Sequence, residues 1–320
     1  MSTEPVSIII PNFNGESLLA ANLPGVIAAG RAYAGKVEII VVDDASADRS
    51  VSMLTGGFPQ ARLVCHAANR GFADAVHSGV AAAAYEVLIF LNSDVRPAAD
   101  FIAPLVETLM GGNDLFAVSP LVYDPQGRLQ NVAWNRYKMV RGTIKSTPWD
   151  LTTIDDCRRS GRALKSLFAS GGSIALKKEK FNRLGGFLPL YKPFYMEDMD
   201  LCTRAWMHGW PTLLDPRSTV VHDHVGTIKR FFRAQKIRSV RSRNRLLYLW
   251  LYCSRRRLIL SHVPWTAWRL LLRLLRLDLT FPIALFQSLA RLRAVMVLRA
   301  QMKQSQGFLS LDRILKEIDS

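Results

Sequence analysis

Polar residues follow several short apolar segments of this sequence, at positions where they could bind a cation or a nucleotide. The clearest group is Asn92-Ser93-Asp94, which comes directly after the uninterrupted apolar run Val87–Leu91. Such a run predicts a strand buried on both faces, and ligands of open α/β sheets bind beyond the carboxyl ends of the strands. Asp94 is therefore predicted to bind Mg²⁺ or Mn²⁺, which prefer hard oxygen ligands. The alternative is a simple turn, since Asn, Ser and Asp favour turns and helix N-caps.

Two further polar positions lie at the ends of predicted strands. Asp44 follows the apolar segment 37–42, and its carboxylate could accept a hydrogen bond from a nucleobase or a ribose. His222 begins the sequence His-Asp-His after a strand predicted over 218–221. This histidine is either a metal ligand or a solvated loop residue.

Glu197 and Asp198 open a predicted helix that ends near Gly209. Acidic residues in a first helical turn are expected from capping and from the helix dipole alone, so both could be structural. The functional alternative is a carboxylate that accepts a proton during a reaction. Asp200 and Arg204 are four residues apart and are predicted to form a salt bridge along the same helix.

These positions depend on an alternation of strands and helices in the first hundred residues. The predicted strands cover residues 6–10, 37–42, 63–65 and 87–91. Parallel neighbouring strands need crossover helices, so the alternation predicts a Rossmann-like, mainly parallel α/β sheet flanked by helices. In such a sheet Phe13, Asp44, Asn69 and the segment 92–94 all follow strands and converge on one edge.

Neither common phosphate-binding loop is present, because the chain contains no GxGxxG and no GxxxxGKS or GxxxxGKT sequence. A bound nucleotide would then have to be held by carboxylates and a metal ion. Gly171-Gly172 interrupts a strand predicted over 168–177. The pair either permits the close approach of a ligand or another backbone, or forms a β-bulge.

The charge of +16 on these 320 residues is confined to one part of the chain. Residues 1–227 hold 22 Lys and Arg and 22 Asp and Glu, whereas residues 228–320 hold 20 and 4. We therefore predict a neutral globular domain over 1–227 and a basic region over 228–320. A basic region of this kind favours a polyanionic partner, either nucleic acid or an anionic membrane.

The cysteines show no metal-binding or disulfide spacing, which favours a reducing cytoplasm. The N-terminal sequence lacks the features of a signal peptide, so we expect a protein that is not exported. No uninterrupted apolar stretch reaches the roughly 18 to 20 residues that a membrane-spanning helix needs.

The basic region contains an amphipathic helical pattern. Arg269, Arg273 and Arg276 fall on one helical face, leucines surround the other, and Trp265 and Trp268 precede them. This pattern is typical of a helix that lies in a membrane interface with tryptophans at the headgroups. The alternatives are a core-packing helix with a solvated arginine face, or a nucleic-acid-binding segment, for which no reader motif is present.

Together the motifs resemble glycosyltransferase family 2, a group of inverting enzymes with the GT-A fold. The resemblance covers residues 5–226, and each motif is weak alone while their order and spacing are specific. In chain order they are VSIIIPNFNG, VVDDASAD, NRGFADAVHSG, FLNSDV, ASGGSIALKKEKFNRLGGF, FYMEDMDLCTRAWMHGW and VVHDHVG. Phe13 stands where the family more often has Tyr, and His77 where Asn is common.

The resemblance implies roles for individual residues. Asp198 would be the general base, with Glu197 beside it. Asp94 would carry the carboxylate share of metal binding within the Asn-Ser-Asp motif, and His222, rather than His224, would be a further metal or diphosphate contact. The expected nucleotide contacts are Pro11, Phe13, Asp44, Asn69, Arg70, Gly71, Asn92, Ser93 and Gly172.

The same resemblance implies a metal-dependent transfer from a nucleotide-diphospho-sugar, UDP- or dTDP-linked, to a lipid-linked glycan. We expect a protein peripheral on the inner face of the cell membrane, building bacterial surface polysaccharide without a nucleic-acid partner. The alternatives are a nucleotidyltransferase and a non-catalytic membrane-docking scaffold. Burial against Phe194, Tyr195 and Trp206 is expected to raise the pKa of Asp198.

Overall fold

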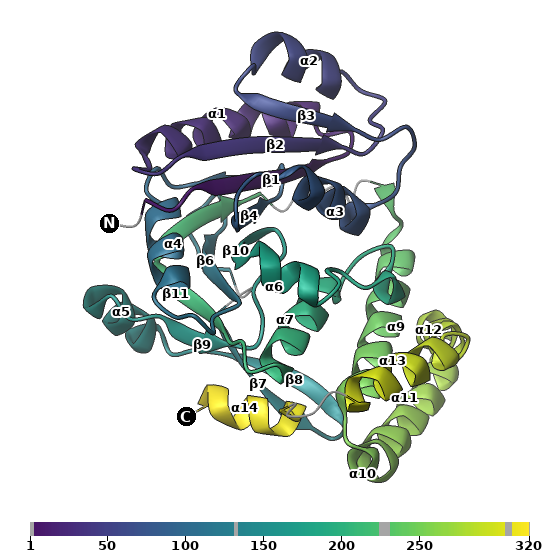
Figure 1. Ribbon diagram of the computed structural model, residues 1–320. Coiled ribbons are helices and arrows are strands. Elements are labelled where there is room, and N and C mark those ends of the chain that lie inside the picture. The colour runs from purple at the N-terminus through teal and green to yellow at the C-terminus, as the bar shows by residue number, and fades with distance from the viewer. Residues whose placement is uncertain (1–2, 131–133, 224–230, 305–308, 320) are drawn as a thin grey trace.

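In the computed structural model the chain folds around one mixed sheet with helices on both faces (Figure 1). The structure describes residues 3–130, 134–223, 231–304 and 309–319. Within these residues the main sheet has strand order β3-β2-β1-β4-β10-β6-β11-β5, and β9 pairs with β11. The strands are β1 (Val6–Asn12), β2 (Val37–Asp43), β3 (Ala61–Cys65), β4 (Val87–Leu91), β5 (Val95–Pro97), β6 (Ala117–Tyr123), β9 (Leu164–Ser166), β10 (Ser173–Lys177) and β11 (Thr212–His222).

The N-terminal half of the sheet has the predicted Rossmann-like arrangement. Strands β1, β2, β3 and β4 are all parallel. Their residues alternate between two cores: Ile8 and Ile10 pack on one face with α1 and α4, while Ile9 packs on the other with α3. These helices and their neighbours are α1 (Glu16–Ala32), α2 (Ser50–Gly57), α3 (Phe72–Ala82), α4 (Ile102–Met110), α6 (Lys178–Arg183) and α7 (Glu197–Met207).

The second half of the sheet is mixed rather than parallel. Strand β10 runs antiparallel to both β4 and β6, and β11 is parallel to β6 but antiparallel to β5 and β9. Ser173 pairs with Leu91, so β10 enters the sheet at the edge where β4 ends. The strand predicted over 168–177 therefore begins only at Ser173. Gly171 and Gly172 lie in the turn before it, so the β-bulge alternative is wrong.

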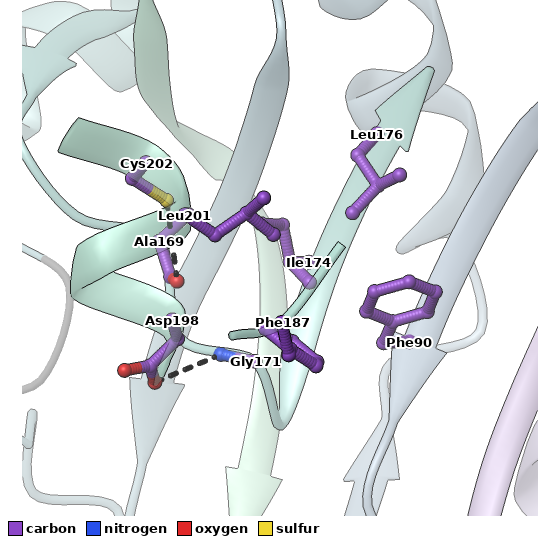
Figure 2. Close-up of a pocket in the computed structure, with 9 residues that line it drawn as sticks. All are labelled: Phe90, Ala169, Gly171, Ile174, Leu176, Phe187, Asp198, Leu201 and Cys202. Atoms are coloured by element: carbon purple, nitrogen blue, oxygen red, sulfur yellow. Dashed lines mark hydrogen bonds between the residues drawn. The ribbon is translucent and has the colours of Figure 1, made fainter. Parts of the chain in front are cut away.

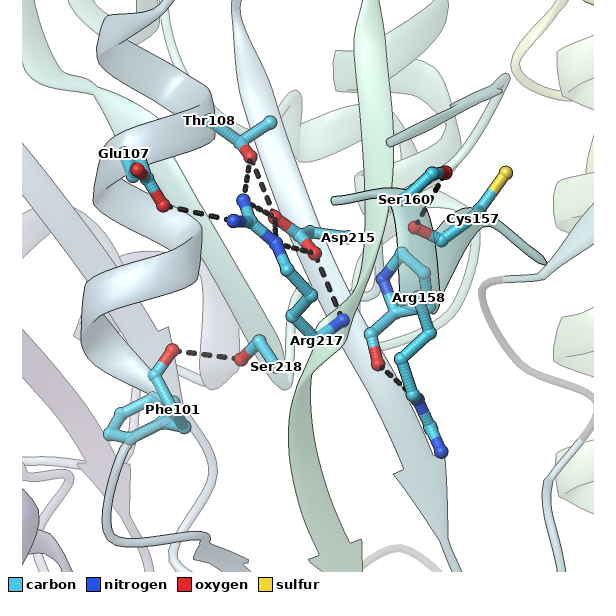
Figure 3. Close-up of polar contacts among 10 residues, drawn as sticks. Phe101, Glu107, Thr108, Cys157, Arg158, Ser160, Asp215, Arg217 and Ser218 are labelled. Atoms are coloured by element: carbon cyan, nitrogen blue, oxygen red, sulfur yellow. Dashed lines mark hydrogen bonds and ion pairs between the residues drawn. The ribbon is translucent and has the colours of Figure 1, made fainter. Parts of the chain in front are cut away.

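Strand β11 reaches the same edge because of an irregularity in its middle. Asp215 pairs with Pro120 and Thr219 with the next residue, Leu121, so three residues of β11 loop out of the ladder. Figure 3 shows how the buried Asp215 carboxylate holds this loop, accepting hydrogen bonds from the Thr108 hydroxyl at 2.6 Å and the Arg217 guanidinium at 2.7 Å. The strand then continues in a fixed register to its end at His222.

The basic region 228–320 is helical where it is described, and it packs on the rest of the chain. A common core joins Tyr137 and Trp206 to Leu247 in α9 and Ile314 in α14. The predicted boundary at residue 227 lies among residues that are not described, and the division into two domains stays a prediction. The described elements of the basic region are α9 (Ala234–Tyr252), α10 (Arg255–Arg257), η2 (Leu258–His262), α11 (Val263–Leu275), α12 (Thr280–Leu289), α13 (Leu292–Gln304) and α14 (Leu311–Asp319). Earlier in the chain lie the hairpin β7 (Asn135–Val140) and β8 (Thr143–Pro148), α5 (Leu151–Ser160) and η1 (Pro189–Tyr191).

Most of the large apolar side chains that are exposed in the described residues gather between η2 and α13, and we call them the apolar surface. Helix α11 contains no buried residue, so it is not the core-packing helix of the alternative interpretation. No single described helix is long and apolar enough to span a membrane, although α12 and α13, which are bent by 56° relative to each other, reach that length and apolar composition as a pair. The apolar surface comprises Ile259, Leu260, Val263, Trp268, Leu271, Leu274, Leu275, Leu277, Leu279, Ile283, Phe286, Leu289, Leu292, Met296 and Val297.

Candidate active site

The loops after β2 and β3 are joined by the side chain of Asp44. Its carboxylate accepts hydrogen bonds from the backbone N–H groups of Arg70 at 2.8 Å and Gly71 at 2.7 Å, and lies 2.7 Å from Nδ1 of His66. Asn69 donates to the Asp44 carbonyl at 3.3 Å. Asp44 thus fixes the backbone of residues 69–71, the predicted nucleotide-binding segment. The sequence alone did not indicate this structural role. Its predicted contact with a nucleobase stays a prediction.

The predicted nucleobase contacts at the end of β1 lie beside this loop. The ring of Phe13 packs against Phe231, with centroids 5.3 Å apart. Pro11 is half-buried in β1, opposite Val42. Asn12, which sequence reasoning passed over, ties β1 to β2 by donating to the Asp43 carboxylate at 2.9 Å. An exposed aromatic residue from the start of the basic region therefore reaches the predicted nucleobase position.

Asp94 and His222 come together at the ends of β4 and β11, with Oδ2 and Nε2 3.3 Å apart. Asp94 is nearly buried, and Gln130 fixes the backbone of His222 by donating to its carbonyl at 3.0 Å. A carboxylate and an imidazole suit Mn²⁺ or Mg²⁺ when substrate phosphates supply further oxygens. Across the described ranges no cluster of three or more His, Cys, Asp and Glu side chains could hold a metal ion by itself. His224 lies outside the described residues.

A short chain of contacts links this pair to the predicted general base. Asn92 donates from its backbone to the Gly172 carbonyl at 2.9 Å, and the Gly171 N–H donates to Oδ2 of Asp198 at 3.2 Å. A Cβ atom on Gly172 would lie 2.7 Å from the Asn92 side chain. The glycine pair therefore permits a close approach, as one of its two interpretations predicted. Ser93, buried between Asn92 and Asp94, is held through its carbonyl by Asn22 at 3.0 Å.

Asp198 sits at the start of α7 against an apolar wall (Figure 2). Phe187 and Leu201 line the space beside it, which is too narrow to admit a water molecule. Burial raises the pKa of Asp198, while hydrogen bonds from Gly171 and Met199 oppose that rise. The predicted direction is confirmed. The lining residues differ from the expected Phe194, Tyr195 and Trp206, because α7 turns this side of Asp198 toward the sheet.

The pKa of the neighbouring Glu197 is also raised. Burial, together with the negative charge of Asp198, raises the pKa of Glu197 to about 8. The buried Oε2 atom of Glu197 has no hydrogen-bond partner, which also disfavours a negative charge there. The two adjacent carboxyl groups thus have different environments. Such differences are usual among the acids and bases of active sites.

Residues of α9 hold the segment that leads into these carboxyls, and no local sequence signal indicates this role. The buried Asn244 amide lies 2.7 Å from the Tyr191 carbonyl, 2.9 Å from that of Phe194 and 2.8 Å from that of Tyr195. Tyr195 and the next residue, Met196, have φ angles of 71° and 79°, in the left-handed region that ordinary side chains disfavour. Asn244 therefore stabilises a strained backbone directly before Glu197 and Asp198.

Two other sequence observations have structural explanations. The predicted salt bridge between Asp200 and Arg204 is confirmed at 2.8 Å, and the buried Asp200 also accepts hydrogen bonds from Tyr191 and Tyr252. His77, which stands where the family often has Asn, accepts a hydrogen bond from the Phe187 N–H at 3.0 Å. Burial lowers the pKa of His77.

The mixed sheet, with an aspartate beyond β4 and a carboxyl pair at the start of α7, defines a glycosyltransferase of the GT-A fold. Solved structures agree on the fold. GalNAc-T7 with UDP, GalNAc and Mn²⁺ matches 79% of this chain and 49% of its own, with a TM-score of 0.60 and 19% identity. The mannosyltransferase PcManGT of Pyrobaculum calidifontis, with GDP-Man and Mn²⁺, matches 94% of this chain and 81% of its own, with a TM-score of 0.54 and 21% identity.

The family follows from the sequence match. The model of glycosyl transferase family 2 matches residues 7–185, more than half of the chain, and the protein belongs to that family. An N-acetylglucosaminyl-diphospho-decaprenol L-rhamnosyltransferase of Mycobacterium tuberculosis is 25% identical over 58% of this chain and 66% of its own length. An undecaprenyl-phosphate 4-deoxy-4-formamido-L-arabinose transferase of Pectobacterium carotovorum is 33% identical over 34% of this chain and 35% of its own. The chain thus matches less than two thirds of the length of either relative.

Proposed function

We propose that the protein transfers a sugar, with inversion, from a nucleotide-diphospho-sugar to a hydroxyl group of a lipid-linked glycan. The observation that carries this proposal is the chain of contacts through Asn92 and the glycine turn, which puts Asp94 and Asp198 on one edge of the sheet. A leaving diphosphate near Asp94 and an attacking hydroxyl near Asp198 could then act on the same sugar. The product would be a component of a bacterial surface polysaccharide.

Each part of the site has a task in such a reaction. Asp94 and His222 would hold Mg²⁺ or Mn²⁺, which supplies charge neutralisation for the leaving nucleoside diphosphate. Asp198 would take the proton of the acceptor hydroxyl as that oxygen attacks the anomeric carbon. The raised pKa of Asp198 suits this task, because a more basic carboxylate is a better proton acceptor.

The nature of the substrates is supported by the relatives rather than by the geometry. Two neighbours of the same fold were solved with UDP or GDP-Man and Mn²⁺. The names of both curated relatives contain a polyprenyl carrier, decaprenol or undecaprenyl phosphate. We propose a UDP- or dTDP-sugar as the donor and a polyprenyl-linked glycan as the acceptor.

We further propose that the protein works at the inner face of the cell membrane, bound through the apolar surface. Arginines accompany this surface on α10 and α11, and an anionic lipid headgroup attracts each basic residue near it with about 1 kcal/mol. Leu275 and Phe286, which are 72% and 75% exposed, belong to a large group of exposed apolar side chains, and such groups mark sites that bind a membrane or another protein. An anionic membrane would bind both features, because its acyl chains accept the apolar side chains and its headgroups attract the arginines.

Calorimetry with UDP, dTDP, GDP and CDP, with and without Mn²⁺, tests the donor site. We expect one nucleotide to bind tightly only with Mn²⁺, and Asp94→Ala to abolish that dependence on the metal. Asp124→Ala, at a carboxylate on the loop after β6, is the matched control and should keep it. If no nucleotide binds to the wild-type protein with or without Mn²⁺, the proposed function is wrong, and a non-catalytic scaffold is the better interpretation.

A further inference from the structure

Helix α9 lies between α7 and the helices α11 to α13, which carry most of the apolar surface (Figure 1). Its buried side is tied to α7 by the hydroxyl groups of Thr203 and Tyr248, which are 2.8 Å apart. Its other side carries Arg238, Arg241 and Arg245, all exposed. Their spacing of three and four residues places them in one row along the helix.

Two of these arginines contact named neighbours, one of them in the segment that leads into Asp198. The Arg241 guanidinium lies 4.5 Å from the centre of the Tyr195 ring, and Arg245 donates to the Ile144 carbonyl at 3.2 Å. Among the described residues, neither forms an ion pair with a carboxylate. Two arginines next to an active site therefore keep most of their donors available.

The buried Tyr137 senses the charges of both α7 and α9. Burial raises the pKa of Tyr137, the charge of Asp198 raises it further, and the charge of Arg245 lowers it. Both charged groups therefore lie within electrostatic range of one side chain.

The row continues toward the apolar surface through Arg269 of α11. This guanidinium is half-buried over the Phe281 ring, 4.5 Å from its centre. Burial lowers the pKa of Arg269, and the nearby charges of Arg273 and Arg245 lower it further. Positive charge thus extends from the surroundings of Asp198 to the helices that carry the exposed leucines.

We infer that Arg241 and Arg245 bind the phosphate or diphosphate group of the acceptor, between its sugar at Asp198 and its lipid on the apolar surface. Guanidinium groups match phosphate oxygens in charge and in planar, paired hydrogen-bond geometry. Arginines without carboxylate partners bear a charge that a phosphate would neutralise. The inference rests on the proposed function in that it takes the acceptor to be lipid-linked.

Binding of farnesyl diphosphate to the full chain, measured by calorimetry with EDTA present, tests this site without donor, metal or turnover. We expect the double variant Arg241→Gln/Arg245→Gln to bind farnesyl diphosphate at least tenfold more weakly than the wild type. Farnesol, which lacks the diphosphate, should bind both proteins equally. Arg313→Gln, at an exposed arginine of α14, is the matched control and should bind farnesyl diphosphate as the wild type does.

Three outcomes would overturn the inference: no binding of farnesyl diphosphate to the wild type, unchanged binding in the double variant, or an equal loss of farnesol binding. If the double variant instead loses only its binding to phosphatidylglycerol vesicles, these arginines contact lipid headgroups and the inference is wrong. A failure of the transferase proposal would show separately, as absent nucleotide binding in a protein that still distinguishes farnesyl diphosphate from farnesol.

Discussion

Two neighbouring carboxyl groups with different surroundings dominate the chemistry at the scale of single residues. Burial raises the pKa of both Glu197 and Asp198. Both oxygens of Asp198 accept backbone N–H groups, from Gly171 and Met199, whereas Oε2 of Glu197 has no partner. The charge of Asp198 also raises the pKa of Glu197, because two neighbouring carboxyl groups resist carrying two negative charges at once.

Replacing Asp198 by Asn should separate chemistry from binding. The amide keeps the shape but cannot take a proton, so we expect turnover to fall by roughly 10²- to 10⁴-fold while the affinity for the nucleotide is unchanged. The wild-type rate should also fall on the acidic side of a pH–rate profile, with an apparent pKa above that of an ordinary carboxylate, which titrates near 4, because burial raises the pKa of Asp198. An acidic limb at or below pH 4 would contradict the assignment of Asp198 as a base with a raised pKa.

The protonation of Glu197 can be tested through stability. Its pKa rises on folding from the ordinary value of 4.5 to about 8. Protonated Glu197 therefore contributes stability that is fully present below pH 4.5 and is lost as the pH rises to about 8. We expect the thermal midpoint of Glu197→Gln, measured against the wild type, to increase across this window and then level off. The exposed Glu179→Gln is the control, and a Glu197→Gln difference as flat as the control's would show that Glu197 is ionised at neutral pH.

At the scale of elements, α9 is the support of the active-site segment. Asn244→Leu keeps the size of the side chain but removes its two N–H donors, so buried carbonyls lose partners at a cost of about 1–3 kcal/mol each. We expect a destabilised protein whose kcat falls at least tenfold, because the strained backbone at Tyr195 and Met196 can relax and displace Asp198. The KM for the donor should not change. Gln235→Leu, at an exposed amide of the same helix, is the control.

A loss of stability in Asn244→Leu without any change in kcat would show a structural role only. Asn244→Gln, which restores the donors on a longer side chain, should recover part of the lost kcat if Asn244 positions the segment. If Asn244→Gln recovers no kcat, and kcat and KM keep their wild-type ratio in Asn244→Leu, Asn244 does not position the segment.

The elements also show where sequence reasoning succeeds. Strand β4 covers Val87–Leu91 as predicted, because an unbroken apolar run with polar residues behind it is a local signal. The turn at Gly171-Gly172 and the reversed direction of β10 were not predicted, because strand direction depends on pairing with β4, far away in sequence. The role of Asn244 was equally hidden, since its partners lie about 50 residues earlier and exposed and buried asparagines look alike in a sequence.

At the scale of the whole molecule, the apolar surface should govern membrane binding. We expect Leu275→Glu and Phe286→Glu each to weaken binding to phosphatidylglycerol vesicles by about tenfold or more, because the new carboxylate must leave water or withdraw from the bilayer. Nucleotide binding should not change. Leu151→Glu makes the same substitution at an exposed leucine of α5 and should leave vesicle binding intact. Equal losses in all three variants, or none, would remove the membrane proposal.

The shared core around Trp206 also sets the order in which parts of the protein can form during synthesis. A ribosome delivers the N-terminal half first, so β1 to β4 and their helices can assemble while the rest is still being made. The apolar side chains around Trp206 are covered only when α9 and α14 arrive. The core around Trp206 is therefore complete only after the apolar surface has been synthesised. A newly made chain thus exposes its apolar surface before α14 closes the core behind α7.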